Sequence, residues 1–185
     1  MKVHELVARC ALASENADPM ASLREVLESL RGEVAGIERA LHYISGTVGN
    51  ANQVFYRSPD LTLLKVRFPN GRRTPPHDHG TWASILLLSG VEKNTLYRTD
   101  NGTLRKAGEV TLAPGQILSM RADTAHVAEC VGDQPTIGLH VYGGDIFALP
   151  RRMWNPQTLE ACPLDWVLYE NFARMASAAA SAPAP

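Results

Sequence analysis

The sequence predicts a mainly β protein, an antiparallel barrel or sandwich of short strands with helices before it and one short helix after it. From residue 53 to residue 143, short apolar and β-branched runs are separated by turn residues at regular spacing, which is typical of this architecture. Residues 3–45 instead carry apolar side chains at helical spacing, and residues 163–175 form another stretch of helical character.

The chain has 185 residues, a length that suits one domain with room for a sizeable core. We divide this expected single domain, residues 1–185, into N-terminal helices at 1–46, a β-barrel at 53–150, a C-terminal segment at 151–175 and a disordered tail at 176–185. The tail is assigned from its low-complexity composition of alanine, serine and proline.

Composition argues against several classes of function. The formal net charge is -1, so neither nucleic acid nor an anionic membrane has an electrostatic reason to bind. Nowhere does the sequence contain the roughly 18 consecutive apolar residues of a membrane-spanning helix. The three cysteines are scattered, as expected of reduced thiols. We expect a cytoplasmic monomer or homodimer that binds no nucleic acid and no membrane.

Two amphipathic helices are predicted in the N-terminal segment. Asp18 is suited to cap a helix that starts with Pro19, because its carboxylate accepts free backbone N–H groups and proline tolerates the first helical position. This helix is expected to end at Gly32, and a second one, starting near Val34, to end at Gly46. Their apolar faces are expected to pack on the outside of the barrel.

Short strands are predicted between the turn residues of the central segment. Proline, glycine, asparagine and aspartate mark the strand ends, because these residues favour turns and interrupt strands. The predicted strands cover residues 53–57, 61–68, 82–89, 91–98, 116–120, 126–131 and 136–142. A helix at 163–175 is expected to follow them.

His77 and His79 are the first residues that point to chemistry. Residues two apart in an extended chain lie on the same face, so both imidazoles are expected to point the same way. Imidazole is the commonest protein ligand for metal ions, and two neighbouring rings form a chelating edge. Five residues separate Gly71 from His77, and Gly90 ends the strand that follows. This G-x5-H-x-H frame resembles the first sequence motif of the cupin β-barrel superfamily, and the resemblance implies a double-stranded β-helix (jelly-roll) barrel.

The cupin resemblance implies a second motif with a third histidine, and Gly115 and His126 occupy its glycine and histidine positions. The glutamate ligand of the first motif is missing, because Ala83 and Ser84 stand where it is usually found. The resemblance thus implies a metal site made of three histidines, His77, His79 and His126. Neutral imidazoles leave the charge of a divalent ion uncompensated, so an anionic substrate is expected to bind it.

The predicted strand at 136–142 carries a second group of chemically active residues. His140 and Tyr142 share one face with Gly138, whereas Leu139 and Val141 share the other. If the aliphatic pair packs under the helices, the histidine and the tyrosine point into the barrel. They are then candidates to act beside the metal.

The three histidines together with this His-x-Tyr strand are similar to the thiol dioxygenases, the cysteine dioxygenase family of cupins, over residues 54–152. The resemblance implies Fe(II) as the cofactor, with O2 and a small-molecule thiol carboxylate as the substrates. It implies that Tyr142, backed by His140, is catalytic, and that both oxygen atoms are added to sulfur to give a sulfinate. Gly138 stands where the family has a serine that normally orients the histidine.

Arginines are expected to select the substrate, because guanidinium grips a carboxylate with two parallel hydrogen bonds. By resemblance, Arg57, next to Tyr56, corresponds to the carboxylate site of cysteine dioxygenases, and Arg151 to the arginine with that task in 3-mercaptopropionate dioxygenases. Two such arginines suit a dicarboxylic thiol, so mercaptosuccinate is the expected substrate. Arg67 and Arg152 are alternative candidates for the second arginine.

Other functions are open at this point. A 3-mercaptopropionate or cysteine dioxygenase would have a substrate with a single carboxylate. Another three-histidine cupin dioxygenase, such as one that cleaves a β-diketone, would have no partner for either arginine. A non-enzymatic metal-binding cupin sensor is the remaining alternative, although the sequence contains no DNA-binding helix pair that would transmit a signal.

Overall fold

The computed structural model describes residues 2–42, 52–100 and 102–181. The helices are α1 (Val3–Ser14), α2 (Pro19–Ser29), α3 (Val34–His42) and α4 (Trp166–Ser181), with a 3-10 turn η1 (Arg31–Glu33) after α2. The strands are β1 (Asn52–Arg57), β2 (Thr62–Phe68), β3 (Ala83–Ser89), β4 (Glu92–Asp100), β5 (Thr103–Leu112), β6 (Ile117–Met120), β7 (Thr124–Cys130), β8 (Thr136–Tyr142), β9 (Arg152–Trp154) and β10 (Ala161–Pro163). Within the described residues, no helix combines the length and apolar character needed to cross a membrane.

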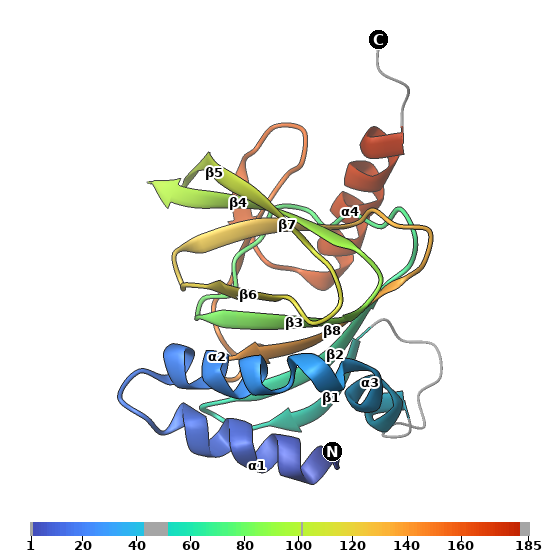
Figure 1. Ribbon diagram of the computed structural model, residues 1–185. Helices are drawn as coiled ribbons and strands as arrows, with labels where there is room; N and C mark the ends of the chain where they lie inside the picture. The colour runs from blue at the N-terminus through green and yellow to red at the C-terminus, as the bar shows by residue number, and fades with distance from the viewer. Residues whose placement is uncertain (1, 43–51, 101, 182–185) are drawn as a thin grey trace.

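Two antiparallel sheets form the body of the molecule (Figure 1). The larger has the strand order β1-β2-β8-β3-β6 and the smaller the order β5-β4-β7, while β9 and β10 form a separate hairpin. Strands distant in the sequence pair with each other, as β2 does with β8 and β4 with β7, so the chain winds back and forth between the sheets. The fold is a double-stranded β-helix with flanking helices, as the resemblance of the sequence implies.

Each predicted strand is present, with both ends within two residues of the prediction. The prediction missed β5, β9 and β10. The side chains of β5 are mostly exposed, because this strand lies at the edge of its sheet and pairs only with β4. An edge strand of this kind lacks the apolar run by which buried strands are identified.

The central strands of the larger sheet are buried on both faces, because one buried cluster packs against the helices and another fills the barrel. On β3, Ala83, Ile85 and Leu87 point into the barrel, whereas Leu86 and Leu88 point toward the helices. On β8, Leu139 and Val141 also pack against the helices, which leaves the alternate residues for the barrel interior. The register of this strand therefore decides which of its side chains can reach a site inside.

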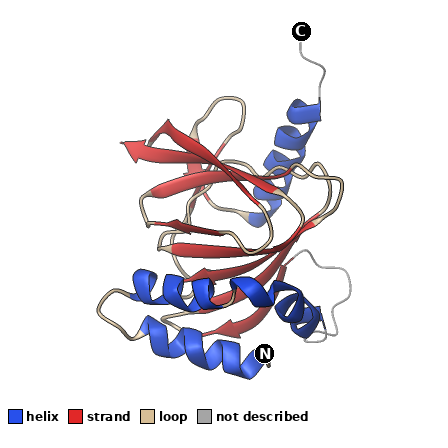
Figure 2. Cartoon of the chain, in the orientation of Figure 1, coloured by secondary structure: helices blue, strands red, loops and turns tan. Residues whose placement is uncertain are grey.

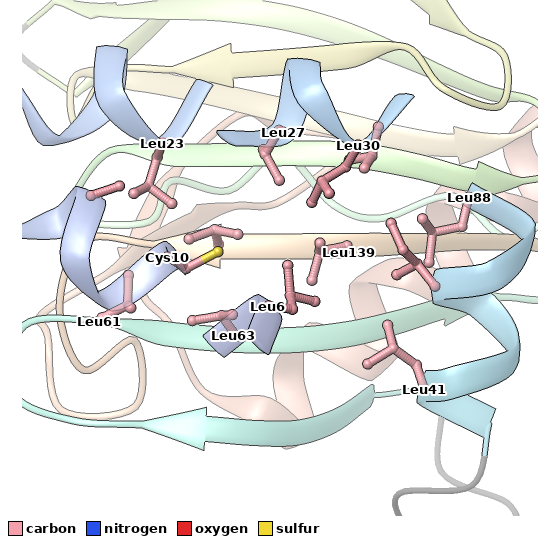
Figure 3. Close-up of a cluster of buried hydrophobic side chains, with 14 residues drawn as sticks. Leu6, Cys10, Leu23, Leu27, Leu30, Leu41, Leu61, Leu63, Leu88 and Leu139 are labelled. Carbon is pink, nitrogen blue, oxygen red and sulfur yellow. The ribbon is translucent and has the colours of Figure 1, made fainter. Parts of the chain in front are cut away.

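The three N-terminal helices cover the outer face of the larger sheet (Figure 2). Figure 3 shows leucines of the N-terminal helices directed at the strands, where Leu23 and Leu27 of α2 belong to one buried cluster with Leu139 of β8. The predicted cap of α2 is confirmed, because Asp18 Oδ1 accepts a hydrogen bond of 3.0 Å from the backbone N–H of Ala21. The predicted end of the next helix at Gly46 lies outside the described residues.

The C-terminal segment differs from the prediction. Helix α4 starts at Trp166 and continues to Ser181, so the predicted disordered tail is wrong for residues 176–181. Alanine is the best helix former, and the alanine-rich stretch simply prolongs the helix. Glu170 of α4 binds Arg72 through two hydrogen bonds of 3.0 and 2.8 Å, which ties the helix to the segment that leads to His77.

Candidate metal centre

The segment from His77 to His79 lies between β2 and β3 in the sequence, and hydrogen bonds of His77 and Asp78 hold it in place. His77 and His126 of β7 exchange two backbone hydrogen bonds, of 3.0 and 2.9 Å. The buried carboxylate of Asp78 accepts hydrogen bonds from the backbone N–H and the Nε of Arg152, at 2.7 and 2.8 Å. The aspartate thus anchors the extended segment, while the imidazoles on either side of it line the cavity inside the barrel.

The structure brings the three predicted metal ligands together. One ligand nitrogen from each of His77, His79 and His126 lies within 4.8 Å of the others, and all three rings are buried. The ring centroids are 5.3 Å apart for His77 and His79, 4.6 Å for His77 and His126, and 5.0 Å for His79 and His126. Among the described residues, no acidic side chain belongs to this group.

The ring nitrogens that face away from the centre are largely occupied. His77 Nδ1 lies 2.9 Å from the carbonyl oxygen of Pro75, and His126 Nδ1 lies 2.8 Å from Oδ1 of Asn94. Both acceptors require a proton on Nδ1, which leaves the lone pair on Nε2. His79 Nδ1 is buried without a partner among the described residues. Converging imidazole lone pairs are a donor set that fits Fe, Zn, Cu or Ni.

Burial keeps these imidazoles neutral. It lowers the pKa of His77 and His79 well below the ordinary value, and the neighbouring rings lower it further. The pKa of His126 is lowered to about 3, again mainly by burial, with Arg151 adding to the shift. At neutral pH the ligands are therefore already deprotonated, as metal binding requires.

The position of the missing carboxylate is taken by the buried residues Ala83 and Ser84. Ala83 points into the barrel and pairs across the sheet with Tyr142. Ser84 is also buried, and its hydroxyl lies 3.0 Å from that of Ser119 on β6. Neither residue can supply a charged ligand, so any anion at the metal has to come from a ligand outside the protein.

The cavity next to the histidines has a volume of about 70 Å³. This space accommodates several water-sized groups, since one water takes roughly 10–15 Å³ on the same measure. It therefore fits a small ligand only. Apart from the three histidines, its lining residues are Leu64, Val66, Phe68, Ala128, His140, Tyr142, Ile146, Phe147, Arg151, Trp166 and Tyr169.

Arg151 brings a positive charge to the lining of this cavity. Its Nε donates a hydrogen bond of 3.2 Å to the carbonyl oxygen of Asp78, and its guanidinium lies 5.6 Å from the ring centre of Trp166. Burial lowers the pKa of Arg151, although the group stays charged at neutral pH because its ordinary value is far higher. The structure thus places Arg151 at the same cavity as the three histidines.

His140 and Tyr142 also reach the cavity, and they form a pair in which His140 Nδ1 lies 3.0 Å from the tyrosine hydroxyl. The other ring nitrogen, Nε2, is buried without a partner among the described residues. A Cβ atom on Gly138 would lie only 2.8 Å from it. The histidine ring therefore occupies the space that the glycine leaves open.

The structure does not bring Arg57 or Tyr56 to the cavity. The guanidinium of Arg57 forms two hydrogen bonds of 2.8 Å with Asp145, and its side chain is 51% exposed. Tyr56 packs against the cluster between the sheet and the N-terminal helices, on the opposite face of the sheet. A bulge in β1 between Val54 and Tyr56 shifts its register, which strand periodicity alone does not reveal.

The two alternative arginines are placed elsewhere as well. Arg152 is held by Asp78, with Nε 2.8 Å from the carboxylate. Arg67 lies on β2 between the inward-facing Val66 and Phe68, so it points out of the barrel and is exposed. Among the described residues that line the cavity, Arg151 is the one arginine.

Sequence reasoning missed Tyr169 and Trp166, which α4 places at the cavity. The Tyr169 ring lies edge-on to His77 with the centroids 5.4 Å apart, and burial raises the pKa of its hydroxyl to about 12. Trp166 contacts the same tyrosine, at 5.5 Å between ring centroids. The helical spacing of these aromatic residues was visible in the sequence, but nothing there indicated against which end of the barrel the helix packs.

No family model matches the chain. Among solved structures, the chain is similar to an RmlC-like cupin with a double-stranded β-helix fold from Methanocaldococcus jannaschii, with 11% identity and a TM-score of 0.44 over 57% of this chain and 92% of that one. It is also similar to hydroquinone 1,2-dioxygenase from Sphingomonas sp. with 4-hydroxybenzoate bound, with 13% identity and a TM-score of 0.46 over 56% and 71% of the two chains. For KdgF from Halomonas sp. the identity is 19% and the TM-score 0.41, over 50% and 76%.

These likenesses are weak, and the assignment depends on the chain itself. Its strands wind into a double-stranded β-helix, and one end of the barrel gathers three buried histidines whose spacing in the sequence has the form of the cupin motifs. Fold and histidine group together agree with what the cupin resemblance of the sequence implies.

Proposed function

We propose that the protein is a non-haem iron dioxygenase that adds both atoms of O2 to the sulfur of a small mercapto-carboxylic acid. The observation that carries this proposal is one small cavity at which the three histidines, Arg151 and the His140–Tyr142 pair meet. The net reaction, RS⁻ + O2 → RSO2⁻, balances without a reductant or an organic cofactor. When bound by His77, His79 and His126, iron would supply the redox chemistry for this step, which redox-inert zinc would not.

Arg151 is the proposed anchor of the substrate carboxylate. Its Nε is used by the backbone of Asp78, while the described residues offer its terminal nitrogens no hydrogen bond. A buried guanidinium with free N–H groups is suited to a bidentate carboxylate. The thiolate end of the same small molecule would then lie toward the histidines.

The number of arginines at the cavity bears on the choice of acid. One carboxylate, as in 3-mercaptopropionate, is satisfied by Arg151 alone, whereas the second carboxylate of mercaptosuccinate would have to displace Asp145 from Arg57. Cysteine carries an ammonium group, and no acidic side chain is among the described residues that line the cavity. We therefore place 3-mercaptopropionate ahead of mercaptosuccinate, which reverses the order expected from the sequence.

Tyr142 is the proposed proton-bearing group beside the reacting atoms. His140 Nε2 has no acceptor among the described residues, and a buried N–H without an acceptor is costly. This favours the proton on Nδ1, which then donates to the tyrosine oxygen 3.0 Å away. The hydroxyl proton of Tyr142 is left free to point into the cavity, where it would donate a hydrogen bond to substrate or oxygen.

The test is O2 uptake by the Fe(II)-loaded protein with 3-mercaptopropionate, mercaptosuccinate and cysteine, with the sulfinate measured by mass spectrometry. We expect one O2 consumed for each sulfinate formed, the highest kcat/KM for 3-mercaptopropionate, and no turnover by zinc-loaded protein. If no thiol supports O2 uptake while iron is bound, the proposed reaction is wrong, although the metal site is not.

A matched pair of variants tests the carboxylate anchor. Arg151→Met should raise KM about thirtyfold or more, because truncating one partner of a buried charge pair costs about 2–5 kcal/mol. Arg57→Met removes an exposed arginine of the same size and should leave KM nearly unchanged. A preference for mercaptosuccinate that both substitutions weaken equally would restore the two-arginine site.

A further inference from the structure

A row of buried polar side chains leads away from the metal site inside the barrel. It starts at His126 on β7, whose Nδ1 lies 2.8 Å from Oδ1 of Asn94 on β4. It continues through Nδ2 of Asn94, which donates a hydrogen bond of 2.9 Å to Oε1 of Glu92. Thr136 at the start of β8 contributes a further side-chain hydrogen bond to Glu92. The row thus links the smaller sheet to the larger one.

Strand register explains why these groups meet. Asn94 is paired with Ala128, and His126 is two residues from that partner, so the two side chains are diagonal neighbours on one face. Glu92 lies two residues before Asn94 on the same strand and therefore on the same face. All three side chains are at most 2% exposed.

A buried carboxylate without a cationic partner needs an explanation, because burying a charge is costly unless the group is well satisfied. For Glu92, the described residues provide hydrogen bonds from Asn94 and Thr136 but no ion pair. A carboxylate can only accept hydrogen bonds. Its presence therefore decides which way the neighbouring amide points.

The orientation of the amide in turn decides where the proton of His126 is found. With Nδ2 of Asn94 directed at Glu92, its oxygen is directed at His126 Nδ1. An oxygen acceptor there requires an N–H on Nδ1, so the lone pair of the ring lies on Nε2. Reversal of the amide would place a donor against Nδ1 and move the proton to Nε2, where it would block coordination.

We infer that Asn94 and Glu92 are positioning residues that hold His126 in the metal-binding tautomer, with Glu92 fixing the amide of Asn94 and Asn94 fixing the imidazole. The inference concerns the metal site on which the proposed function rests, and it does not depend on which reaction the metal supports. Partners of this kind on a ligating histidine typically change metal affinity about 10- to 100-fold.

The first experiment reads the tautomer of His126 in the metal-free protein, from the ring nitrogen chemical shifts in a long-range ¹H–¹⁵N spectrum. Spectra are recorded at about pH 8, where Glu92 is mainly ionised because burial raises its pKa to about 7. We expect the Nδ1–H form in the wild-type protein and a mixture or the opposite form in Asn94→Leu. The Nε2–H form in the wild-type protein would overturn the inference.

The second experiment measures Co(II) affinity by visible absorbance, without turnover. Asn94→Leu should weaken binding about 10- to 100-fold, and Glu92→Gln should weaken it less, because a glutamine amide permits both orientations of Asn94. Equal affinity of Asn94→Leu and wild type would contradict the proposed role. Thr95→Val is the matched control, since Thr95 is buried on the same strand with its hydroxyl 3.4 Å from Glu109, and its affinity should be unchanged.

A swapped pair keeps the test decisive if Asn94→Leu fails to fold. In the double variant Glu92→Gln with Asn94→Asp, the residue at 92 becomes the donor and the residue at 94 accepts from both neighbours, so the acceptor facing His126 is preserved. We expect Nδ1–H on His126 and a Co(II) affinity within about threefold of the wild type. Folded double-variant protein with an Nε2–H ring, or with affinity as low as that of the metal-site variant His126→Ala, would refute the donor–acceptor argument.

Discussion

His126 and His140 are buried imidazoles of the same barrel, one from each sheet, and the pKa of each is lowered to about 3, mainly by burial. They differ in their partners. His126 donates from Nδ1 to Asn94 and directs Nε2 toward the other ligands, whereas Nδ1 of His140 meets Tyr142 and its Nε2 has no partner among the described residues. Residue type, burial and pKa do not separate these two imidazoles, but their hydrogen-bond partners do.

The largest expected difference between the two histidines is in metal binding. His126→Ala should weaken iron binding strongly, because a ligand itself is removed. The loss of affinity should exceed the about 10- to 100-fold that results when only a hydrogen-bond partner of a ligand is lost. His140→Ala should keep iron, since this ring is outside the group of converging ligand nitrogens. The iron content of both variants is measured after anaerobic loading and gel filtration. Equal loss of iron in the two variants would contradict the different roles given to the two histidines.

On the His140 side, the effect should appear in turnover. Tyr142→Phe should lower kcat by about 10²–10⁴, the usual contribution of a proton donor in the transition state, with little change in KM. Tyr169→Phe is the control at the same cavity, and should cost less because its hydroxyl is already hydrogen-bonded to Thr74. Steady-state kinetics of both variants measure these effects. A rise in KM without a fall in kcat for Tyr142→Phe would reassign Tyr142 to substrate binding.

For the polar side chains that link His126 to Glu92, we expect an effect on how the free energy of unfolding depends on pH. Burial raises the pKa of Glu92 from 4.5 to about 7, so the folded state binds a proton that the unfolded state releases. The contribution of this proton to the free energy of unfolding is therefore fully present below about pH 4.5 and is lost as the pH rises through about 7. The total loss is about 3 kcal/mol.

Glu92→Gln has no such titration, so its free energy of unfolding should rise relative to that of the wild type by about 3 kcal/mol between about pH 4 and pH 8. The difference between the two proteins isolates Glu92, because the buried histidines titrate in both. Urea denaturation of the metal-free proteins measures it. A difference that does not vary with pH would mean that burial does not raise the pKa of Glu92.

The smallest expected effect concerns the glycine under His140. A Cβ on Gly138 would approach Nε2 to 2.8 Å, so Gly138→Ala should displace the ring and cost about 1–3 kcal/mol in stability, as overpacking does. Turnover should fall, while Co(II) affinity stays unchanged. Gly108→Ala on β5 is the control, because nothing lies within 4 Å of its Cβ position. Loss of metal affinity in the Gly138 variant would show that the two histidines are not independent.

The sequence by itself determined the parts of this protein that follow from short-range periodicity. Turn residues located the strands, and the period of two placed His77 with His79 and His140 with Tyr142 on common faces. The third histidine came from a motif resemblance, and the barrel brings it to the pair because His77 and His126 form a bridge between their segments.

Only the tertiary structure decided which partners each polar group finds. Arg57 and Arg151 look alike in the sequence, yet one is taken by Asp145 at the surface and the other is buried at the cavity. Tyr169 reaches the site through the packing of α4, and Glu92 reaches His126 through the register of β4 against β7. Local periodicity fixes the face on which a side chain lies, but distances between segments far apart in the chain are set by how the sheets and helices pack.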